Sequence, residues 1–353
     1  MASQRRFVSD FFPSSAADDD VDELARVPST TRNALLLLNY HLPPLTPHLW
    51  QICDNRTIVC ADGGANRLFD EMPGLVAAAS LDSSSVEGEK KKTSLGWVEA
   101  VRAKYVPRAI VGDLDSVRPE VLTFYSQRGC LCVDLSADQE TSDMHKAIDW
   151  LLRKAEAGGD SAETNLSSSS QKRSETKDEA KKNTTPRVLV AGGLGGRLDH
   201  EMAHLSLLHR YSETNIVLVG NHSTAQLVPP GVSEIFPNWE TEGPTCGLVP
   251  LAGPAVVTTS GLRWNLESQT LALGSLISTS NEIEPGVRGL EATGTIGTGK
   301  GVVGAVGEGD TVTGDDYEAK TNRKKLRPVV RVTTDAPLVW TTELRRRKNN
   351  GAA

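Results

Sequence analysis

Short apolar runs alternate with helix-type patterns between residues 34 and 220, and this alternation limits the folds that the chain can adopt. The runs are rich in β-branched side chains and are bounded by polar residues and glycines, as buried strands are. Strands that alternate with helices form a parallel sheet with helices on its faces. The runs that we expect as strands cover residues 34–39, 57–61, 108–111, 129–135, 188–191 and 215–220.

The pattern changes after about residue 222, where short runs follow one another with turn residues between them. Such runs predict an antiparallel β-sandwich. We therefore expect an α/β fold class: a parallel-sheet, Rossmann-like domain over residues 31–221, followed by an antiparallel β-sandwich domain over residues 222–345. The runs expected as strands of the second domain cover residues 225–228, 247–251, 255–259, 271–274, 276–279, 329–333 and 338–342.

Polar segments without periodicity interrupt both predicted domains. Stretches rich in Ser, Lys, Glu or Gly cannot bury enough apolar surface to form a core. We interpret them as a disordered tail over residues 1–30, insertions at about 82–94, 157–186 and 284–327, and a basic tail over 346–353.

Composition excludes several classes of function. The formal charge is −7, and the basic residues lie in short runs without interleaved aromatics, so no nucleic-acid partner is expected. The five cysteines have no zinc spacing and leave an odd thiol, which favours free thiols in a reducing compartment. No stretch approaches the roughly 20 apolar residues of a membrane span, and no leader pattern is visible. We expect a protein of the cytosol or nucleus without membrane contact, and a cytoplasmic location is the prediction.

Two carboxylates follow the run at 108–111, and they are the centre of the functional hypothesis. Asp113 and Asp115 lie at i and i+2, where their mutual repulsion must be offset. Mg²⁺, which prefers oxygen ligands and bridges to phosphates, would offset it. Asp62, Asp143 and the pair Arg197 and Asp199 follow other expected strands, and ligands of parallel sheets bind at the carboxyl ends of the strands. We therefore expect one anion-binding site with a metal.

Each of these features also has a purely structural interpretation. Residues 112–116 can be an Asp turn in which Ser116 caps the next helix, and Asp143 can stabilise the first turn of its own helix. A Gly-rich turn at 193–196 fails the dinucleotide fingerprint, although its N–H groups could hold phosphate. Residues 294–300 satisfy most of a Walker A pattern, but Gly301 replaces the Ser or Thr that holds Mg²⁺, so we interpret them as a chance match. Three histidines are too scattered for a metal triad: His145, His200 and His204.

Taken together, these stretches resemble the thiamin pyrophosphokinase family. The resemblance covers residues 34–342 apart from the insertions. It implies an α/β catalytic domain followed by a β-sandwich domain, and transfer of a pyrophosphoryl group from ATP to the hydroxyethyl oxygen of thiamin with release of AMP. It also implies a homodimer that binds thiamin between its subunits. The matching stretches are residues 62–68, 112–116, 138–143, 193–199, 246–250, 258–266, 278–281 and 337–341.

The resemblance assigns expected roles residue by residue. The catalytic residues would be Asp113, Asp115, Asp143, Arg197 and Asp199, with the first three as Mg²⁺ ligands. The neighbours of ATP would be Asp62, Gly63, Asn66, Gln139 and Ser142. The thiamin side would hold Trp264, Ser278, Ser280 and Asn281. Trp264 could stack on the thiamin cation, although a lone Trp between strands is more often part of a core.

The chain departs mildly from the family pattern, and no departure removes an acid. The departures are Leu114 for an aromatic residue, Ser142 for Thr, Met144 for Phe, His200 for Gln and Arg263 for Lys.

In the mechanism that the resemblance implies, an alcohol attacks the β-phosphorus of ATP in line while Mg²⁺ and Arg197 neutralise charge. Either Asp143 or Asp113 would accept the proton.

Two alternative functions are a non-catalytic nucleotide- or thiamin-binding protein and a metal-dependent phosphohydrolase. The β domain with its Trp favours transfer to thiamin.

Overall fold

A computed structural model describes residues 4–8, 33–79, 94–156, 186–238, 241–285 and 328–345. Almost all of the three predicted insertions, the basic tail and the Walker-like residues 294–300 lie outside these ranges. The prediction of a disordered N-terminal tail is wrong for the strand β1 (Gln4–Val8), because this segment pairs with another strand in parallel. The remainder of that tail also lies outside the described ranges.

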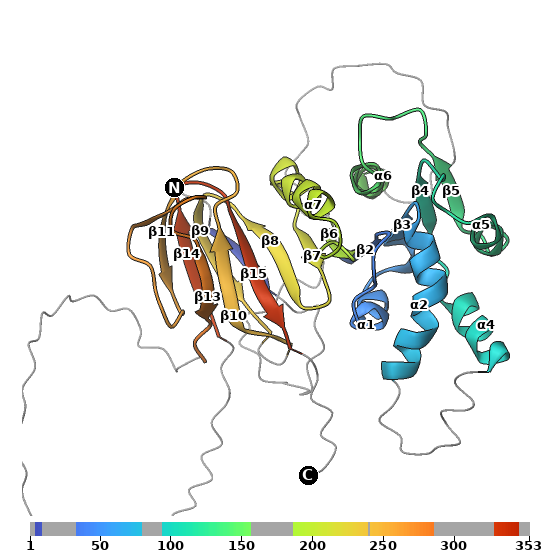
Figure 1. The fold of residues 1–353 in the computed structure, drawn as a ribbon, viewed down its shortest axis with the longest axis horizontal. Helices are drawn as coiled ribbons and strands as arrows, with labels where there is room; N and C mark the ends of the chain where they lie inside the picture. The colour runs from blue at the N-terminus through green and yellow to red at the C-terminus, as the bar shows by residue number, and fades with distance from the viewer. Residues whose placement is uncertain are drawn as a thin grey trace, which may run out of the picture.

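Six parallel strands form one side of a ten-stranded sheet, which confirms the predicted parallel sheet (Figure 1). Their spatial order is β7-β6-β2-β3-β4-β5, so the chain fills positions on one side of β2 before it crosses to the other side. The crevice at such a reversal, outside the carboxyl ends of the strands, is where ligands bind in open α/β sheets. The strands are β2 (Asn33–Leu37), β3 (Ile58–Ala61), β4 (Ala109–Gly112), β5 (Leu131–Asp134), β6 (Arg187–Ala191) and β7 (Ile216–Val219).

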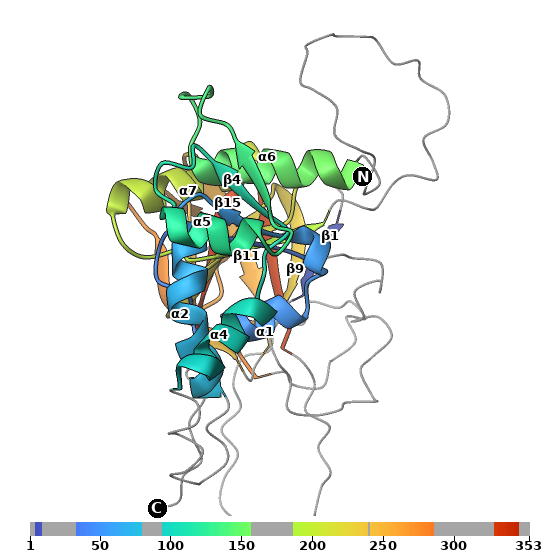
Figure 2. The same cartoon turned by 90° about the vertical axis from the view of Figure 1, so that its right-hand side faces the viewer.

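Helices cover both faces of this sheet, because successive strand residues point to opposite sides. Leu35 and Leu37 join the core with α1, α2, α4 and α5, whereas Leu36 joins the core with α6 and α7. Figure 2 shows α6 and α7 on one side of the sheet and α1, α2 and α4 on the other. The helices are α1 (Thr46–Gln51), α2 (Gly64–Ala79), α4 (Leu95–Lys104), α5 (Pro119–Ser126), α6 (Asp143–Glu156) and α7 (Leu198–Arg210), and η2 (Asn55–Thr57) is a short 3-10 turn.

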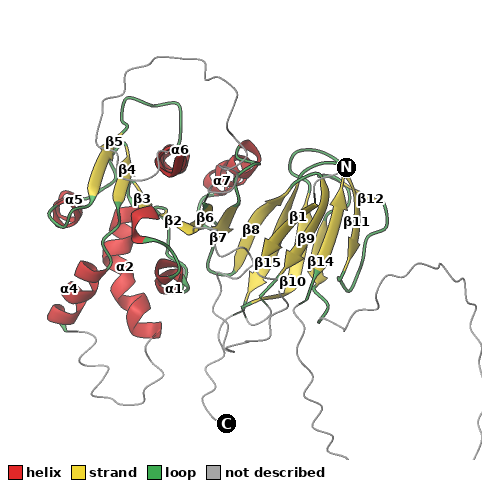
Figure 3. Ribbon diagram, turned by 180° about the vertical axis from the view of Figure 1, so that it is seen from behind, coloured by secondary structure: helices red, strands yellow, loops and turns green. Residues whose placement is uncertain are grey.

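The antiparallel sandwich predicted for the second half is also confirmed (Figure 3). Its first sheet continues from β7 through β8 (Ser223–Val228), β15 (Leu338–Leu344), β10 (Glu242–Val249) and β13 (Ser278–Glu282). Its second sheet has the order β1-β9-β14-β11-β12, with β9 (Gly231–Phe236), β14 (Val330–Thr334), β11 (Ala255–Ser260) and β12 (Gln269–Leu271). The two sheets enclose a core that contains Trp340 and Leu248. Because β7 pairs directly with β8, the sheet is continuous, and the domain boundary near residue 221 stays a prediction.

Gly64 allows α2 to begin against β2. A Cβ atom on this residue would lie 2.2 Å from the carbonyl oxygen of Leu37, which is backbone and cannot move aside. We expect Gly64→Ala to lower the free energy of unfolding by about 3 kcal/mol through this overpacking. Gly74→Ala in the same helix is the matched control, because its Cβ would meet nothing within 4 Å. The control should be stabilised by about 1 kcal/mol, because Ala favours the helix over Gly. Thermal unfolding followed by circular dichroism measures both; equal midpoints would contradict the packing argument.

Candidate active site

Four aspartates from three segments of the parallel sheet lie close together. Asp62 follows β3, Asp113 and Asp115 follow β4, and Asp143 begins α6. Gly112 lies between two of them, since its Cβ would be 2.8 Å from the Cβ of Asp62 and 3.1 Å from Oδ1 of Asp143. The backbone of Ser116 donates to Oδ2 of Asp62 at 3.3 Å. The predicted convergence of these four acids is therefore what the fold produces.

The acids carry more negative charge than their surroundings neutralise. Asp62 is 1 % exposed, and burial, together with the nearby Asp143 carboxylate, raises its pKa to about 6. Burial also raises the pKa of Asp143; Lys146 opposes this rise, and Asp113 and Asp115 add to it. Oδ1 of Asp62 is buried without a hydrogen-bond partner in the described part of the chain. Such a group of carboxylates favours a cation among them.

Lys146 is a member of this cluster that the sequence interpretation missed. Its side chain is 2 % exposed, and its ammonium group forms an ion pair with Asp113. It follows Asp143 by three residues in α6, a spacing that places both side chains on one face of a helix. That spacing, and a lysine on the buried face of an amphipathic helix, were the signals that could have revealed it.

The donor chemistry of the cluster fits Mg²⁺, whereas a complete ligand arrangement is not preformed. Carboxylate oxygens are the ligands that Mg²⁺ prefers, and Oδ1 of Asp62 has no hydrogen-bond partner among the described residues. Among the described residues, however, no group of three or more His, Cys, Asp or Glu side chains is arranged to hold a metal ion. Asp113 is instead engaged in the ion pair with Lys146.

All five cysteines are free thiols, as expected.

The Gly-rich loop after β6 packs against Tyr40, which follows β2. Gly195 and Gly196 have φ values of 106° and 88°, which favour glycine. A Cβ on Gly195 would lie 2.5 Å from Cε1 of Tyr40, and one on Gly196 would lie 2.8 Å from Cε2. The backbone N–H of Gly195 donates to Glu201, so this group already has an acceptor. The sequence interpretation missed Tyr40, and the one signal that could have revealed it is its position shortly after an expected strand.

Arg197 and Asp199 lie at the same edge of the sheet and are paired with each other. Nη2 of Arg197 lies 2.5 Å from Oδ2 of Asp199, and Nε lies 3.1 Å from Oδ1. The hydrogen bond from Arg197 lowers the pKa of Asp199. Both side chains are exposed, and no hydrogen bond or ion pair within the described ranges joins them to the four acids. The structure therefore brings the acids together but leaves this pair at the rim.

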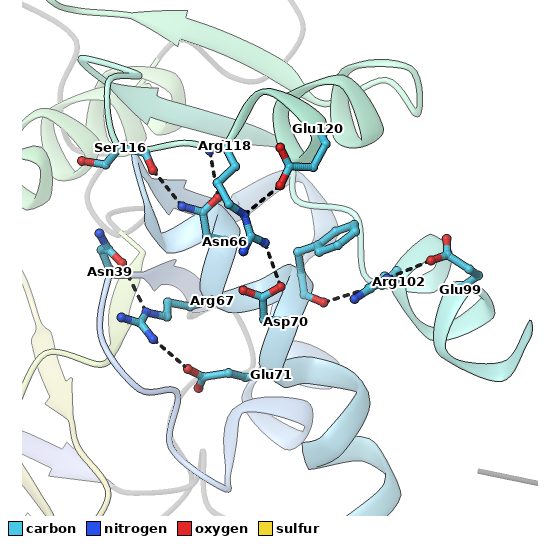
Figure 4. Close-up of polar contacts among 11 residues, drawn as sticks. Asn39, Asn66, Arg67, Asp70, Glu71, Glu99, Arg102, Ser116, Arg118 and Glu120 are labelled. Carbon is cyan, nitrogen blue, oxygen red and sulfur yellow. Dashed lines mark hydrogen bonds and ion pairs between the residues drawn. The ribbon is translucent and has the colours of Figure 1, made fainter. Parts of the chain in front are cut away.

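The residues expected beside ATP differ in how far their side chains are already engaged. Asn66 uses both ends of its amide on backbone groups of the loop after β4 (Figure 4). Gln139 is exposed and donates to the carbonyl of Ser136 at 2.7 Å. Ser142 accepts from the backbone N–H of His145 at 3.4 Å. Gly63 is buried, and its Cβ would lie 2.3 Å from Nδ2 of Asn39.

The four residues expected on the thiamin side lie together in the β-sandwich. Trp264 is 52 % exposed, so it is not a core residue, and the Arg263 guanidinium lies 4.7 Å from its ring centroid. Asn281 is 4 % exposed and holds the backbone of Trp264 by two hydrogen bonds, of 3.2 and 2.8 Å. Ser278 is buried beside it, and Ser280 is exposed with a φ of 55°. Trp264 and Ser280 are thus the members that face solvent.

Asp62 gives a prediction about stability without metal. A carboxyl whose pKa is raised by folding stabilises the native state at low pH, and this contribution is lost as the pH rises through the folded pKa of about 6. We expect Asp62→Asn to unfold at a higher temperature than the wild type at pH 8 in EDTA, because the amide removes a buried charge. The gap should shrink at pH 5, where Asp62 is protonated. Thermal unfolding at both pH values measures this; a lower midpoint for the variant at pH 8 would contradict it.

Two family models and several relatives match this chain. The family model described as "Thiamin pyrophosphokinase, catalytic domain" matches residues 46–219, and "Thiamin pyrophosphokinase, vitamin B1 binding domain" matches residues 233–302. Thiamine pyrophosphokinase 1 of Oryza sativa subsp. japonica is 40% identical over 253 residues, 71% of this chain and 80% of that protein. Thiamine pyrophosphokinase 1 of Arabidopsis thaliana is 38% identical over 256 residues, 72% of this chain and 80% of that protein.

A solved structure supports the fold. The crystal structure of yeast thiamin pyrophosphokinase has a TM-score of 0.60 at 18% sequence identity and covers 97% of this chain and 91% of its own. At this identity the likeness concerns the fold alone. No helix in the described ranges is long and apolar enough to span a bilayer.

Proposed function

This chain belongs to the thiamin pyrophosphokinase family, and from this premise we propose how its residues perform the reaction of that family. The chain transfers a pyrophosphoryl group from ATP to the hydroxyl group of thiamin, which gives thiamin diphosphate and AMP. The observation that carries the proposal is the convergence of Asp62, Asp113, Asp115 and Asp143 at the carboxyl ends of neighbouring strands. Transfer of a phosphoryl group requires positive charge near the transferred oxygens, and Mg²⁺ would supply it. Carboxylates that converge in this way are the groups that would hold Mg²⁺.

We assign the acids to the metal and to the attacking hydroxyl. Asp113, Asp115 and Asp143 would hold Mg²⁺, which supplies positive charge to the phosphate oxygens when bound. Asp143 and Asp113 are the two candidates for the proton acceptor. Asp113 is already engaged in an ion pair with Lys146.

Charges at the rim would orient the phosphate chain. Arg197 is exposed and can exchange Asp199 for a phosphate oxygen of ATP, and an arginine there would stabilise the transferred group. Asp62, Gly63, Gln139 and Ser142 line the nearby strand and helix ends and are proposed as neighbours of ATP.

Trp264 is the proposed platform for the thiamin cation. Its ring is exposed, and the guanidinium group of Arg263 already lies over it, so the ring can hold a cation. Asn281 fixes the backbone of Trp264 by hydrogen bonds. We expect Trp264→Ala to raise the KM for thiamin by about tenfold, the loss of one cation–π contact, with the KM for ATP unchanged. Leu95→Ala, another exposed apolar residue, is the control. Steady-state kinetics with each substrate varied in turn gives the result; an unchanged thiamin KM would remove Trp264 from the site.

The assembly and location of the protein remain proposals. A homodimer with thiamin between its subunits is what the family resemblance implies, and light scattering after gel filtration would measure the oligomeric state. A cytoplasmic location stays a prediction.

One incubation separates the proposed reaction from its alternatives. The chain is mixed with ATP, Mg²⁺ and thiamin, and thiamin diphosphate, AMP and inorganic phosphate are quantified. Equal amounts of thiamin diphosphate and AMP support the proposal. Inorganic phosphate without thiamin diphosphate indicates a phosphohydrolase, and thiamin binding by calorimetry without AMP indicates a non-catalytic binding protein.

A further inference from the structure

We propose that Asn66 is a positioning residue that holds the acid loop, defined as residues 113–118 between β4 and α5, in its active shape. This inference rests on the proposed function and replaces the expected role of Asn66 as a nucleotide ligand. Its carboxamide acts on Asp113 and Asp115 through the main chain of the loop that carries them.

Both ends of the Asn66 amide are bonded to this loop (Figure 4). Nδ2 donates to the carbonyl oxygen of Ser116 at 2.7 Å, and Oδ1 accepts from the backbone N–H of Arg118 at 3.1 Å. These partners lie 50 and 52 residues further along the chain. A side chain that satisfies two backbone groups of a distant loop is committed to holding that loop.

The acid loop needs such a contact, because its own conformation is unfavourable. Leu114 has a φ of 61°, in the left-handed region that non-glycine residues seldom adopt. Conformations of this kind persist where the surrounding structure fixes them. The side chain of Arg118 also reaches α2 through Asp70 at 2.8 Å, but both side chains are substantially exposed, so this ion pair restrains the loop weakly.

Asn66 is itself fixed, because it lies in the first turn of α2. The preceding Gly64 places the start of that helix against the carbonyl of Leu37 in β2. The backbone of Ser116 also donates to Asp62, which lies two residues before the helix. Asn66 therefore transmits the position of the central sheet to the loop that carries Asp113 and Asp115.

The pattern of one donor and one acceptor explains why asparagine stands here. An aspartate of the same shape could still accept from Arg118, but it would place a second acceptor against the carbonyl oxygen of Ser116. Asn66→Asp therefore removes one bond at constant size, and Asn66→Ala removes both. Arg102→Gln is the matched control. Arg102 donates to the carbonyl of Phe69 at 3.0 Å and lies over its ring, so its loss also weakens contacts of α2 but touches no residue of the acid loop.

Two measurements on the full chain test the inference. The first is hydrogen exchange of the peptide that contains residues 113–118, in protein without ligands. Both Asn66 variants should exchange faster there than the wild type, and Arg102→Gln should not. This result does not depend on the activity of the protein, so it separates failure of this inference from failure of the proposed function. Unchanged exchange in both Asn66 variants would overturn the inference.

The second measurement is Mn²⁺ binding without nucleotide, followed by electron paramagnetic resonance, together with kinetics. Mispositioned carboxylates should weaken Mn²⁺ binding and lower kcat by about 10- to 100-fold each, as the loss of residues that orient metal ligands does, with little change in the KM for ATP. The Arg102→Gln control should keep the Mn²⁺ affinity of the wild type. A raised KM for ATP at unchanged Mn²⁺ affinity and kcat would instead identify Asn66 as a nucleotide ligand.

Discussion

Asp115→Asn lowers kcat for thiamin diphosphate formation on the order of 10³-fold, the scale expected when a group that holds charge at a phosphoryl-transfer site is removed. Asp115 is exposed, and its side chain interacts with the hydroxyl of Ser116 at 3.1 Å. The amide keeps the shape of the residue but removes the negative charge and one oxygen ligand. Folding should be unaffected, because an exposed carboxylate contributes little to the core. Steady-state kinetics and thermal unfolding on the same preparation measure both effects.

Asp54→Asn is the matched control for this substitution. Asp54 is also exposed, but it precedes β3 and therefore lies at the opposite edge of the sheet, where it accepts from the backbone of Arg56 at 2.9 Å. Asn caps such a turn as well as Asp does. The control should retain the kcat of the wild type. Near-normal activity of Asp115→Asn would remove this residue from the metal site.

Lys146→Met is expected to have the second largest effect, a fall in kcat of about 10²-fold, the scale that follows the loss of one preorganised charged or hydrogen-bonding group from an active site. The methionine keeps the length of the buried side chain but leaves Asp113 without its partner. Lys146 also opposes the rise in the pKa of Asp143. Its loss should therefore raise this pKa further, so the acidic limb of the pH–activity profile should move to higher pH. Activity measured across the acidic range gives both results.

Lys154→Met provides the control on the same helix. Lys154 is exposed near the end of α6, and its ammonium group lies 5.8 Å from the centroid of Trp150 instead of among the acids. This variant should keep the kcat and the pH profile of the wild type. A Lys146→Met enzyme with an unchanged acidic limb would show that Lys146 does not set the charge of the cluster.

The fold was predictable because its signals are local. Buried parallel strands such as β3 and β4 are continuous apolar runs, and the turn residues that follow them end each strand clearly. The parallel order then places Asp62, Asp113, Asp115 and Asp143 at one edge without any further information. Strand β9 was missed because its sequence, Gly-Val-Ser-Glu-Ile-Phe, puts Glu234 at a buried position that pairs with Arg331 across the sheet.

The parts of the site that sequence reasoning missed depend on contacts between distant segments. Lys146 joins the acids because α6 crosses the sheet end beside β4, and Tyr40 packs on the Gly-rich loop because β2 neighbours β6. Asn66 was predicted as a neighbour of ATP, whereas its amide bonds to backbone groups 50 and 52 residues further along the chain, on which its proposed positioning role rests. The contacts of Tyr40 and Asn66 leave no periodic signal in the sequence, whereas the position of Lys146 three residues after Asp143 places both on one face of α6.

The central claim is that acids from separate strand ends hold a divalent ion against the phosphates of ATP. A crystal structure with Mg²⁺ and a non-hydrolysable ATP analogue tests it most directly. We expect a metal ion with carboxylate oxygens of Asp113, Asp115 or Asp143 at about 2.0–2.1 Å and a phosphate oxygen in the same coordination sphere. An analogue whose phosphates lie away from these strand ends, with its metal bound by none of the three aspartates, would contradict the account.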